Sequence, residues 1–165
     1  MLLDLREIIN VPGGLVSFNC EVELGDSLVG SAREVLGPAR VTGFVKNTAG
    51  VLDFHADLAA TLLCVCARCL KEFHYPVDSG IDATIIESDV ESEEEDFFNL
   101  VGDSVDVDEI VITSFVLGME QRQFCSDDCK GLCEKCGADL NEGPCTCTAD
   151  IDPRLAVLGQ LLEND

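Results

Sequence analysis

Residues 51–86 read VLDFHADLAATLLCVCARCLKEFHYPVDSGIDATII and carry the clearest strand pattern in the chain. Polar residues such as Asp53, His55 and Asp57 alternate there with small or apolar residues. The small and apolar members of this alternation are Leu52, Phe54, Ala56, Leu58, Ala60, Leu62, Cys64 and Cys66. A period of two residues is typical of a strand with one buried face. The run exceeds the usual strand length, so we expect a bend or a break midway.

The alternation resumes after the segment CARCLKE, residues 66–72, at Phe73, Tyr75, Val77, Ile81, Ala83 and Ile85. Cys66 and Cys69 are therefore expected where one strand turns into the next. Residues 15–24 alternate in the same way, and residues 39–47 read as a further strand. The two histidines, His55 and His74, lie in strand patterns, where a solvent-exposed side chain is a better expectation than a catalytic base.

Two segments of the first 124 residues are expected to be helical. Residues 2–9 would form a short helix with Leu2, Leu5 and Ile9 on one side, ending before a Pro-Gly-Gly breaker. Residues 102–124 would form a second helix, with Asp106 or Asp108 as the cap. Apolar residues surround most of the circumference of this second helix, which predicts that it is well buried.

A third helix is expected at the end of the chain, over residues 150–165. Asp152 would cap it, and Pro153 would occupy its first position. An apolar stripe of Leu155, Leu158 and Leu162 favours docking on the protein's own core over binding to a partner.

Together these elements predict an α+β fold. It consists of an antiparallel, partly closed β-sheet with a buried helix, a C-terminal cysteine-rich zinc knuckle and a short terminal helix. Residues 1–122 are expected to form the sheet domain, which includes an acidic loop at residues 87–96. Residues 123–165 are expected to form the zinc-binding module and the terminal helix, packed on the first domain.

The charge is strongly negative, at -22, with 32 Asp and Glu residues against ten Lys and Arg residues. Residues 73–120 contain no Lys or Arg, and seven of the ten residues from 87 to 96 are acidic. Such a surface repels phosphates, so direct nucleic-acid binding is disfavoured and a basic protein partner is favoured. The alternative, that the acidity only keeps the protein in solution, stays open on charge alone.

The start of the chain and its hydropathy bear on the compartment. Residues 1–10 lack the basic and long apolar regions of a signal peptide, and no window of about 18 uncharged apolar residues exists. We therefore expect a cytoplasmic protein without a membrane span. Thiols stay reduced in the cytoplasm, where clustered cysteines indicate a metal site more often than disulfides.

Six of the ten cysteines lie in residues 125–147, CSDDCKGLCEKCGADLNEGPCTC. This segment holds too few apolar residues for a core of its own, so a bound metal is expected to order it. CxxC spacing lets two thiolates converge on one ion, and four thiolates close a tetrahedral structural zinc site. The predicted metal ligands are Cys66, Cys69, Cys125, Cys129, Cys133, Cys136, Cys145 and Cys147.

Two partitions of these ligands remain open. In the first, slightly preferred, Cys66 and Cys69 join Cys125 and Cys129 in one site, and the other four cysteines form a second. The first site would then staple the end of the chain to the sheet, and the second would be a free-standing knuckle. In the rival partition one zinc ion is held by Cys133, Cys136 and two more cysteines of the segment, which leaves Cys66 and Cys69 free. An Fe–S cluster ranks below zinc.

The two remaining cysteines, Cys20 and Cys64, lie on the apolar faces of strand patterns and are expected to be small buried hydrophobes. The sequence contains no GxGxxG, P-loop, HExxH or GxSxG motif. A small-molecule substrate and an enzymatic activity are therefore not expected.

The order of these motifs resembles that of a known family. An alternating strand ends in CARCLKEF, an acidic loop follows, VDVDEIV opens a helix, and CKGLCEKCGADLNEGPCTC and DPRLAVLGQLL close the chain. This combination is similar to the bacterial YceD family, the large ribosomal RNA subunit accumulation proteins. The resemblance covers most of the chain and is weakest over residues 1–40.

The resemblance implies a non-enzymatic ribosome assembly factor that supports accumulation of 23S rRNA. It implies partners among basic ribosomal proteins or assembly proteins, and a metal that is scaffold and takes no part in chemistry. Two alternatives are kept. One is a zinc module that binds large-subunit rRNA directly, although Lys130 and Lys135 are outnumbered by acidic neighbours. The other, ranked lower, is a thiol or metal redox protein, which needs a low-pKa thiol or an open metal position.

Overall fold

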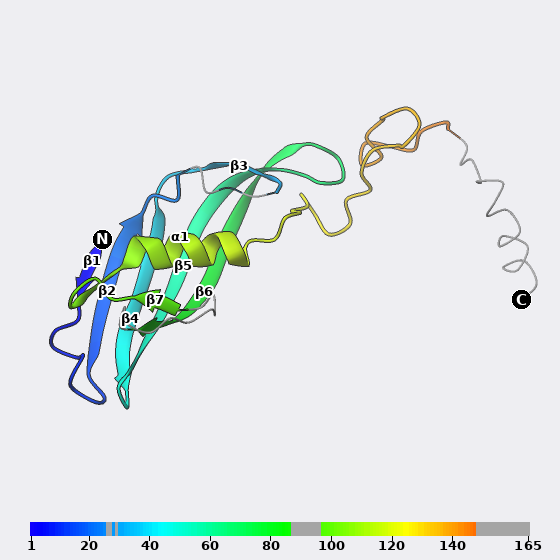
Figure 1. Ribbon diagram of the computed structural model, residues 1–165. Coiled ribbons are helices and arrows are strands. Elements are labelled where there is room, and N and C mark those ends of the chain that lie inside the picture. The colour runs from blue at the N-terminus through cyan, green and yellow to red at the C-terminus, as the bar shows by residue number, and fades with distance from the viewer. Residues whose placement is uncertain (26–27, 29, 87–96, 148–165) are drawn as a thin grey trace, which may run out of the picture.

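The computed structural model describes residues 1–25, 28, 30–86 and 97–147. In these residues eight strands come before one helix along the chain (Figure 1). Their bounds are β1 Leu2–Asp4, β2 Leu15–Val22, β3 Ala32–Val35, β4 Ala39–Thr48, β5 Val51–Val65, β6 Glu72–Ile86, β7 Phe97–Asn99, β8 Ser104–Asp106 and α1 Val107–Gly118.

The main sheet has the order β2-β4-β5-β6-β7, in which β7 alone pairs in parallel. Strand β5 pairs with β6 along almost its whole length, from Leu52 opposite Ile85 to Val65 opposite Glu72. The midway break that we expected in β5 does not occur. The discontinuity lies in its other neighbour, because β4 pairs with β5 only as far as Ala59 and β3 takes over at Leu62.

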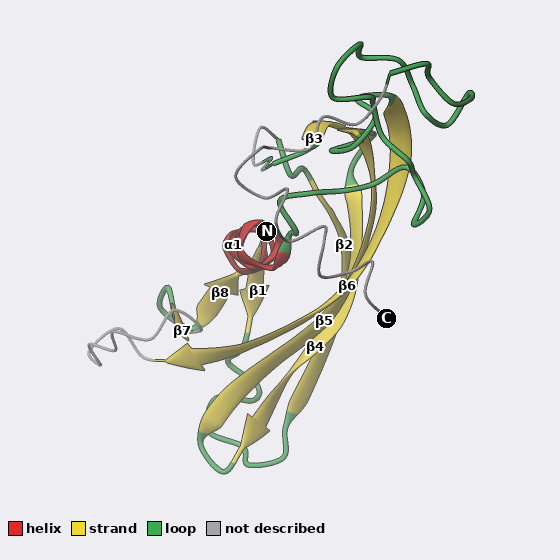
Figure 2. Cartoon of the chain, turned by 90° about the vertical axis from the view of Figure 1, so that its right-hand side faces the viewer, coloured by secondary structure: helices red, strands yellow, loops and turns green. Residues whose placement is uncertain are grey.

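The alternation of residue types places one face of this sheet in the core. The apolar positions of β5 are buried from Leu52 to Cys64, with Ala60 half-buried, and Phe54 and Leu62 are fully enclosed. Val22, Val41 and Val45 bury their side chains on the same face. Helix α1 crosses this face, and strands β1 and β8 lie on the same side (Figure 2). The strand predictions over residues 15–24, 39–47, 52–66 and 73–85 are therefore confirmed to within two residues at each end.

Helix α1 begins where its cap predicts. The Asp106 carboxylate accepts a hydrogen bond from the Asp108 backbone N–H at 3.1 Å, and the chain's N-terminal ammonium lies 2.7 Å from the Asp108 carboxylate. The helix ends at Gly118, six residues earlier than expected from residues 102–124. The following segment is extended because Gln121 accepts a hydrogen bond from the Ser31 N–H and Gln123 accepts one from the Ala67 N–H.

The prediction of a helix over residues 2–9 is wrong. Leu2–Asp4 forms strand β1, which pairs with β8, a segment about one hundred residues away in the chain. Leu5 and Ile8 then bury their side chains in a turn, while Leu2 is 63% exposed. Buried Asn47 donates its amide to the carbonyls of Ile8 and Ile9 and holds this turn against β4.

In the part of the chain that the structure describes, the observed class is a mostly β structure with one short helix. Among the described strands, β2 and β7 end the main sheet and do not pair with each other, so the expected partial closure is not confirmed. The predicted acidic loop at 87–96 and the predicted terminal helix at 150–165 lie entirely outside the described residues. The division at residue 122 stays a prediction. No helix in the described part of the chain is long and apolar enough to span a membrane.

Candidate metal centre

Eight cysteine side chains gather in two groups of four. The first group comprises Cys66, Cys69, Cys125 and Cys129, and the second comprises Cys133, Cys136, Cys145 and Cys147. Within each group all Sγ atoms lie within 4.8 Å of one another. The grouping matches the slightly preferred partition, and Cys66 and Cys69 lie with the other cysteines of their group. Each group could hold a metal ion.

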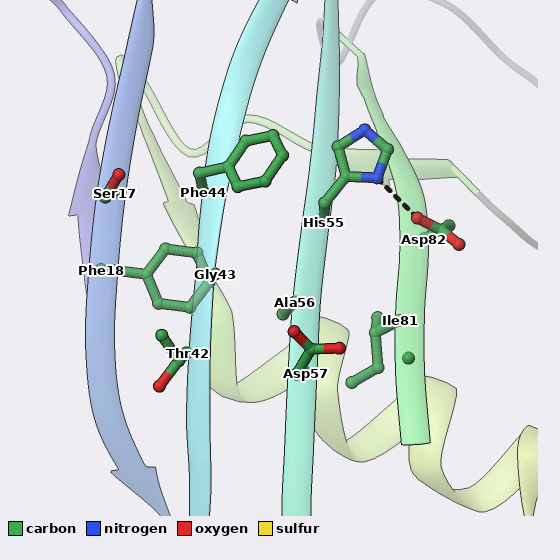
Figure 3. Close-up of a pocket in the computed structure, with 11 residues that line it drawn as sticks. Ser17, Phe18, Thr42, Gly43, Phe44, His55, Ala56, Asp57, Ile81 and Asp82 are labelled. Carbon is green, nitrogen blue, oxygen red and sulfur yellow. Dashed lines mark hydrogen bonds and ion pairs between the residues drawn. The ribbon is translucent and has the colours of Figure 1, made fainter. Parts of the chain in front are cut away.

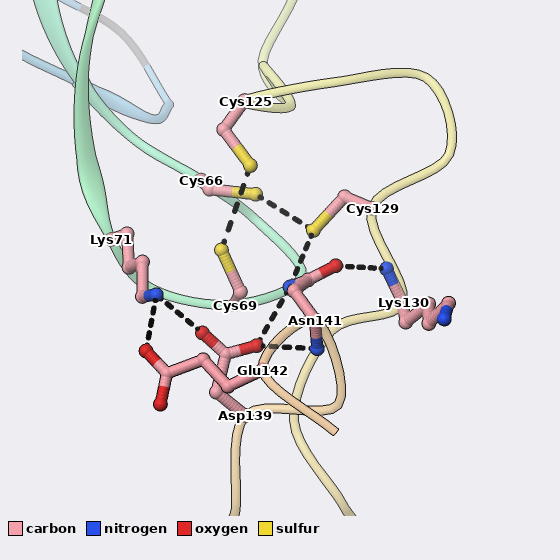
Figure 4. A network of polar contacts seen from close by, with 9 residues as sticks. All are labelled: Cys66, Cys69, Lys71, Cys125, Cys129, Lys130, Asp139, Asn141 and Glu142. Atoms are coloured by element: carbon pink, nitrogen blue, oxygen red, sulfur yellow. Dashed lines mark hydrogen bonds and ion pairs between the residues drawn. The ribbon is translucent and has the colours of Figure 1, made fainter. Parts of the chain in front are cut away.

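The first cluster joins two distant parts of the chain (Figure 4). Cys66 follows β5, and Cys69 lies in the tight turn before β6, where the Leu70 N–H donates to the Cys66 carbonyl at 3.0 Å. Leu70 adopts a positive φ of 60° to close this turn, although it is not glycine. Cys125 and Cys129 come from the segment after α1, and only Cys125 of the four is exposed.

The spacing of the sulfur atoms in the first cluster excludes disulfides and fits a tetrahedral ion. The Sγ atoms of Cys66 and Cys129 are 3.8 Å apart, and those of Cys69 and Cys125 are 3.7 Å apart. A disulfide needs about 2.05 Å. Four thiolates at about 2.3 Å from a zinc ion lie about 3.8 Å from one another. The donor set and its size are therefore compatible with zinc.

Backbone N–H groups point at the sulfur of Cys66. Burial alone raises the pKa of this thiol, but hydrogen bonds from the backbone N–H groups of Cys125, Cys69 and Arg68 lower it to about 6. The neighbouring Cys129 thiol, with burial, raises the pKa of Cys125 to about 12. Crowded thiolates repel one another, so a second ionisation needs a cation between them. The cluster thus favours a bound dication.

The second cluster is built from one short segment. The Cys133 carbonyl accepts the Gly137 N–H at 2.8 Å, and Gly137 adopts a φ of 71°, which is the positive φ expected for the residue after a CxxC pair. The backbone N–H groups of Cys136 and Lys135 lower the pKa of the Cys133 thiol to about 6. The Cys136 thiol raises the pKa of Cys147 to about 12. Cys136 and Cys147 are exposed, and Cys133 and Cys145 are half-buried.

A polar network links the loop that carries the second cluster, residues 133–147, to the first cluster and to Lys71 beside β6 (Figure 4). The Asn141 amide donates to the Cys129 sulfur at 3.5 Å and to the Asp139 carboxylate at 2.7 Å. The same side chain accepts the Lys130 backbone N–H at 2.8 Å. The Lys71 ammonium, next to β6, lies 2.8 Å from Asp139. The expectation of a free-standing second knuckle is therefore wrong, because these contacts hold it against the first.

Arg68 supports the first cluster from the other side. Its guanidinium donates to the carbonyls of Asp127 and Cys129 at 2.9 and 3.1 Å and lies 4.3 Å above the ring of Phe124. The Arg68 carbonyl accepts the Leu132 N–H. Arg68 thus holds the chain on both sides of Cys129, before it through the side chain and after it through the backbone carbonyl.

Sequence patterns did not point to this supporting set. Arg68 and Lys71 look like ordinary surface cations in CARCLK, and Asp139 and Asn141 look like turn residues. A signal existed only for the turn, since Asp139 accepts the Asn141 N–H two residues later. The long-range partners of these residues have no local signature.

The remaining predicted residues lie away from both clusters. Cys64 is fully buried and Cys20 is half-buried against the core, as expected of small hydrophobes. His74 is exposed, and His55 is 43% exposed with its Nδ1 atom 2.5 Å from the Asp82 carboxylate.

Comparison with known proteins identifies the family. The sequence profile described as "Large ribosomal RNA subunit accumulation protein YceD" matches residues 54–162, which include most of β5, all of β6 and α1, and all eight clustered cysteines. The chain belongs to the YceD family. YceD membership confirms the resemblance drawn from the motifs.

Three curated proteins similar to this chain are named as uncharacterized proteins. Uncharacterized proteins of Mycobacterium tuberculosis and Mycobacterium bovis are 32% identical over 117 residues, which cover 64% of this chain and 53% of each relative. This chain therefore spans about half the length of those two relatives. The uncharacterized protein YlbN of Bacillus subtilis is 26% identical over 167 residues, which cover 98% of this chain and 96% of YlbN. No solved structure matches this chain significantly.

Proposed function

We propose that this chain is a non-enzymatic ribosome assembly factor that supports accumulation of large-subunit rRNA through contacts with a basic ribosomal protein or assembly protein. The observation that carries the proposal is the YceD match over residues 54–162, since the name of that family refers to this accumulation. A family name gives the process and leaves the mechanism to physical argument.

Zinc at the two cysteine clusters is the proposed cofactor, and its proposed role is structural. Four thiolates complete a tetrahedral shell and leave no position for water or substrate, which distinguishes structural zinc from catalytic zinc. Metal bound to Cys66, Cys69, Cys125 and Cys129 would fix the segment after α1 to the β5–β6 turn. The closed shells support a role without enzymatic chemistry.

Charge supports a basic partner. A chain with a net charge of -22 attracts cationic proteins over distances of about a Debye length and repels the rRNA phosphates. An acidic factor of this kind shields a basic ribosomal protein from premature contact with RNA. The acidic run at residues 87–96 is the proposed contributor with the highest local charge density.

The test combines depletion with capture. Cells depleted of the protein should lose mature large-subunit rRNA while small-subunit rRNA is unchanged, measured as the ratio of the two species. Purified protein should capture individual purified large-subunit ribosomal proteins at low salt and less at moderate salt, and replacement of residues 87–96 by Gly and Ser should weaken capture. An unchanged rRNA ratio would contradict the proposed process. Tight, salt-sensitive binding of large-subunit rRNA without any captured protein would replace the proposal by direct RNA binding.

A further inference from the structure

One face of the main sheet carries no described element. Figure 2 shows α1, β1 and β8 on one side of the sheet, and no other described helix or strand covers the opposite side. The side chains on that side alternate with the core residues and belong to β2, β4, β5 and β6. Antiparallel sheets often leave one face to water, so the shape and charge of this face decide whether it is more than a solvated surface.

The uncovered face is hollowed along β5 and β6. One hollow of about 410 Å³ lies between Ser17, Phe44, His55 and Asp82 (Figure 3). A second, of about 630 Å³, shares Thr42, Asp57 and Gly80 with the first. A third, of about 290 Å³, shares Arg40, Ala59 and Asp78 with the second and ends at Thr61 and Pro76. We call this continuous depression the sheet groove.

The register of the strands gives the groove its direction and length. The pairs His55–Asp82, Asp57–Gly80, Ala59–Asp78 and Thr61–Pro76 follow one another along β5 and β6. Six residues of strand separate the first pair from the last, which corresponds to about 20 Å. The groove therefore has room for about six residues of an extended segment.

Missing side chains create the depth of the groove. A Cβ atom added to Gly80 would have no heavy atom within 4 Å, so its place on the uncovered face is open space. Small residues lie between larger neighbours such as Phe44 and His55, whose rings contact at a centroid distance of 5.1 Å.

The charge of the groove favours a basic occupant. Three carboxylates, from Asp57, Asp78 and Asp82, line the groove against one guanidinium, from Arg40. Asp82 pairs with His55, whereas Asp57 and Asp78 form no ion pair with a described residue. Carboxylates at alternate positions on neighbouring strands suit Lys or Arg side chains spaced along an extended chain, and they repel a phosphate backbone.

We propose that the sheet groove is the docking site for an extended, basic segment of a protein partner. Lys or Arg side chains of the segment pair with Asp57 and Asp78, and its backbone lies over Gly80. This inference deepens the proposed function and rests on it, because it names the surface that receives the basic partner.

The experiment fills the groove without disturbing the core. Gly80→Phe places a ring in open space on a strand where an aromatic residue is well tolerated. Gly118→Phe is the matched control, because a Cβ atom at Gly118 also has no heavy atom within 4 Å and that residue ends α1 on the other side of the sheet. Asp57→Lys and Glu7→Lys form a second pair with equal changes in net charge, of which only Asp57 lines the groove.

The probes are fluorescein-labelled peptides of about twelve residues that tile the large-subunit ribosomal proteins of the same organism, with a single-stranded RNA of similar length. Anisotropy should show that the tightest peptides are basic, and that Gly80→Phe and Asp57→Lys each weaken them about tenfold or more while both controls stay within about twofold. Circular dichroism establishes that all four variants are folded.

Three results would overturn the proposed docking site. The first is that peptides bind Gly80→Phe as tightly as the unchanged protein. The second is that Gly80→Phe weakens the binding of RNA and not of peptides, and the third is that no peptide binds the unchanged protein. Each of these leaves the proposed function to be decided separately, by the rRNA ratio and by capture of intact ribosomal proteins. If the groove variants have no effect on peptide binding but intact ribosomal proteins are still captured, the basic partner must bind to another surface of the protein.

Discussion

The two cysteine clusters contain the same ligands but differ in where the ligands come from. The first draws Cys66 and Cys69 from the β5–β6 turn and Cys125 and Cys129 from beyond α1, and three of its four cysteines are buried. The second draws all four from residues 133–147 and buries none of them fully. Metal in the first cluster would hold distant segments together, whereas metal in the second would order one local loop.

The difference predicts unequal consequences of losing each ion. Closing a long loop restricts the unfolded chain more than closing a short one, although the dependence on loop length is weak. Burial adds a larger effect, because a first cluster without metal leaves polar thiols crowded inside the structure. The first cluster is therefore expected to determine stability at the end of the sheet.

The largest effect is expected for Cys66→Ser. Loss of this buried ligand should lower the zinc content from two ions to one per chain and the unfolding free energy by more than about 3 kcal/mol. Metal analysis and chemical denaturation measure the two quantities. Cys64→Ser is the control at a neighbouring buried cysteine outside the clusters, and it should keep both ions. Two ions in Cys66→Ser would show that the first cluster is not a four-thiolate site.

Acid should act on both clusters alike, because their thiol chemistry is the same. Each cluster has one thiol with a pKa of about 6, at Cys66 and Cys133, and one near 12, at Cys125 and Cys147. At pH 7 the thiols near 12 hold their protons, so zinc binding must release protons and its affinity must rise with pH. Each released proton changes the affinity about tenfold per pH unit, or about 1.4 kcal/mol.

Calorimetry in buffers of different ionisation enthalpy counts these protons. Zinc should release at least one per cluster at pH 7, and both ions should leave over the same range as the pH falls. Retention of one ion at a pH where the other has dissociated would separate the clusters by chemistry as well as by position.

A smaller effect is expected for Cys136→Ser in the exposed second cluster. Zinc content should again fall to one, but the unfolding free energy should fall by only about 1 kcal/mol, because the sheet and the first cluster stay intact. Thermal unfolding followed by circular dichroism compares it with Cys66→Ser. Equal losses of unfolding free energy in the two variants would contradict the claim that the first cluster contributes more to stability than the second.

The smallest effect is expected for Lys71→Ala, which cuts the ion pairs to Asp139 and Glu142. Lys71 is about half exposed, so solvent screens these pairs and the stability loss should stay within about 1 kcal/mol. Lys46→Ala, on an exposed position of β4, is the control. The specific readout is the rate at which a chelator removes the second ion, which should rise only in Lys71→Ala.

Local patterns in the sequence were sufficient for some elements. The period of two in residues 52–66 and 73–85 predicted β5, β6 and their buried face, and Asp106 predicted the start of α1. These predictions succeed because each of these features is determined by residues only a few positions apart in the chain. Cysteine spacing also indicated the preferred grouping, since a CxxC pair brings two thiols together by local geometry alone.

The features that the sequence did not predict depend on pairing between residues far apart in the chain. The first residues had a helical pattern, yet β8 captures Leu2–Asp4 as a strand. The segment after Gly118 had a helical composition, yet Ser31 and Ala67 hold it extended. The link from Lys71 to Asp139 crosses almost seventy residues of chain. None of these partners has a spacing that a local pattern can reveal.

The most direct test of the staple formed by the first cluster is hydrogen exchange with and without a chelator. The Ala67 N–H bonds to Gln123 and the Leu132 N–H bonds to Arg68, so both report the contact between the turn and the segment after α1. In the unchanged protein, chelation should abolish the protection of the Ala67 and Leu132 amides while amides in the middle of β5 stay protected. In Cys136→Ser, which keeps the ion of the first cluster, the Ala67 and Leu132 amides should stay protected when no chelator is added. Protection at Ala67 and Leu132 that survives removal of all metal would contradict the account.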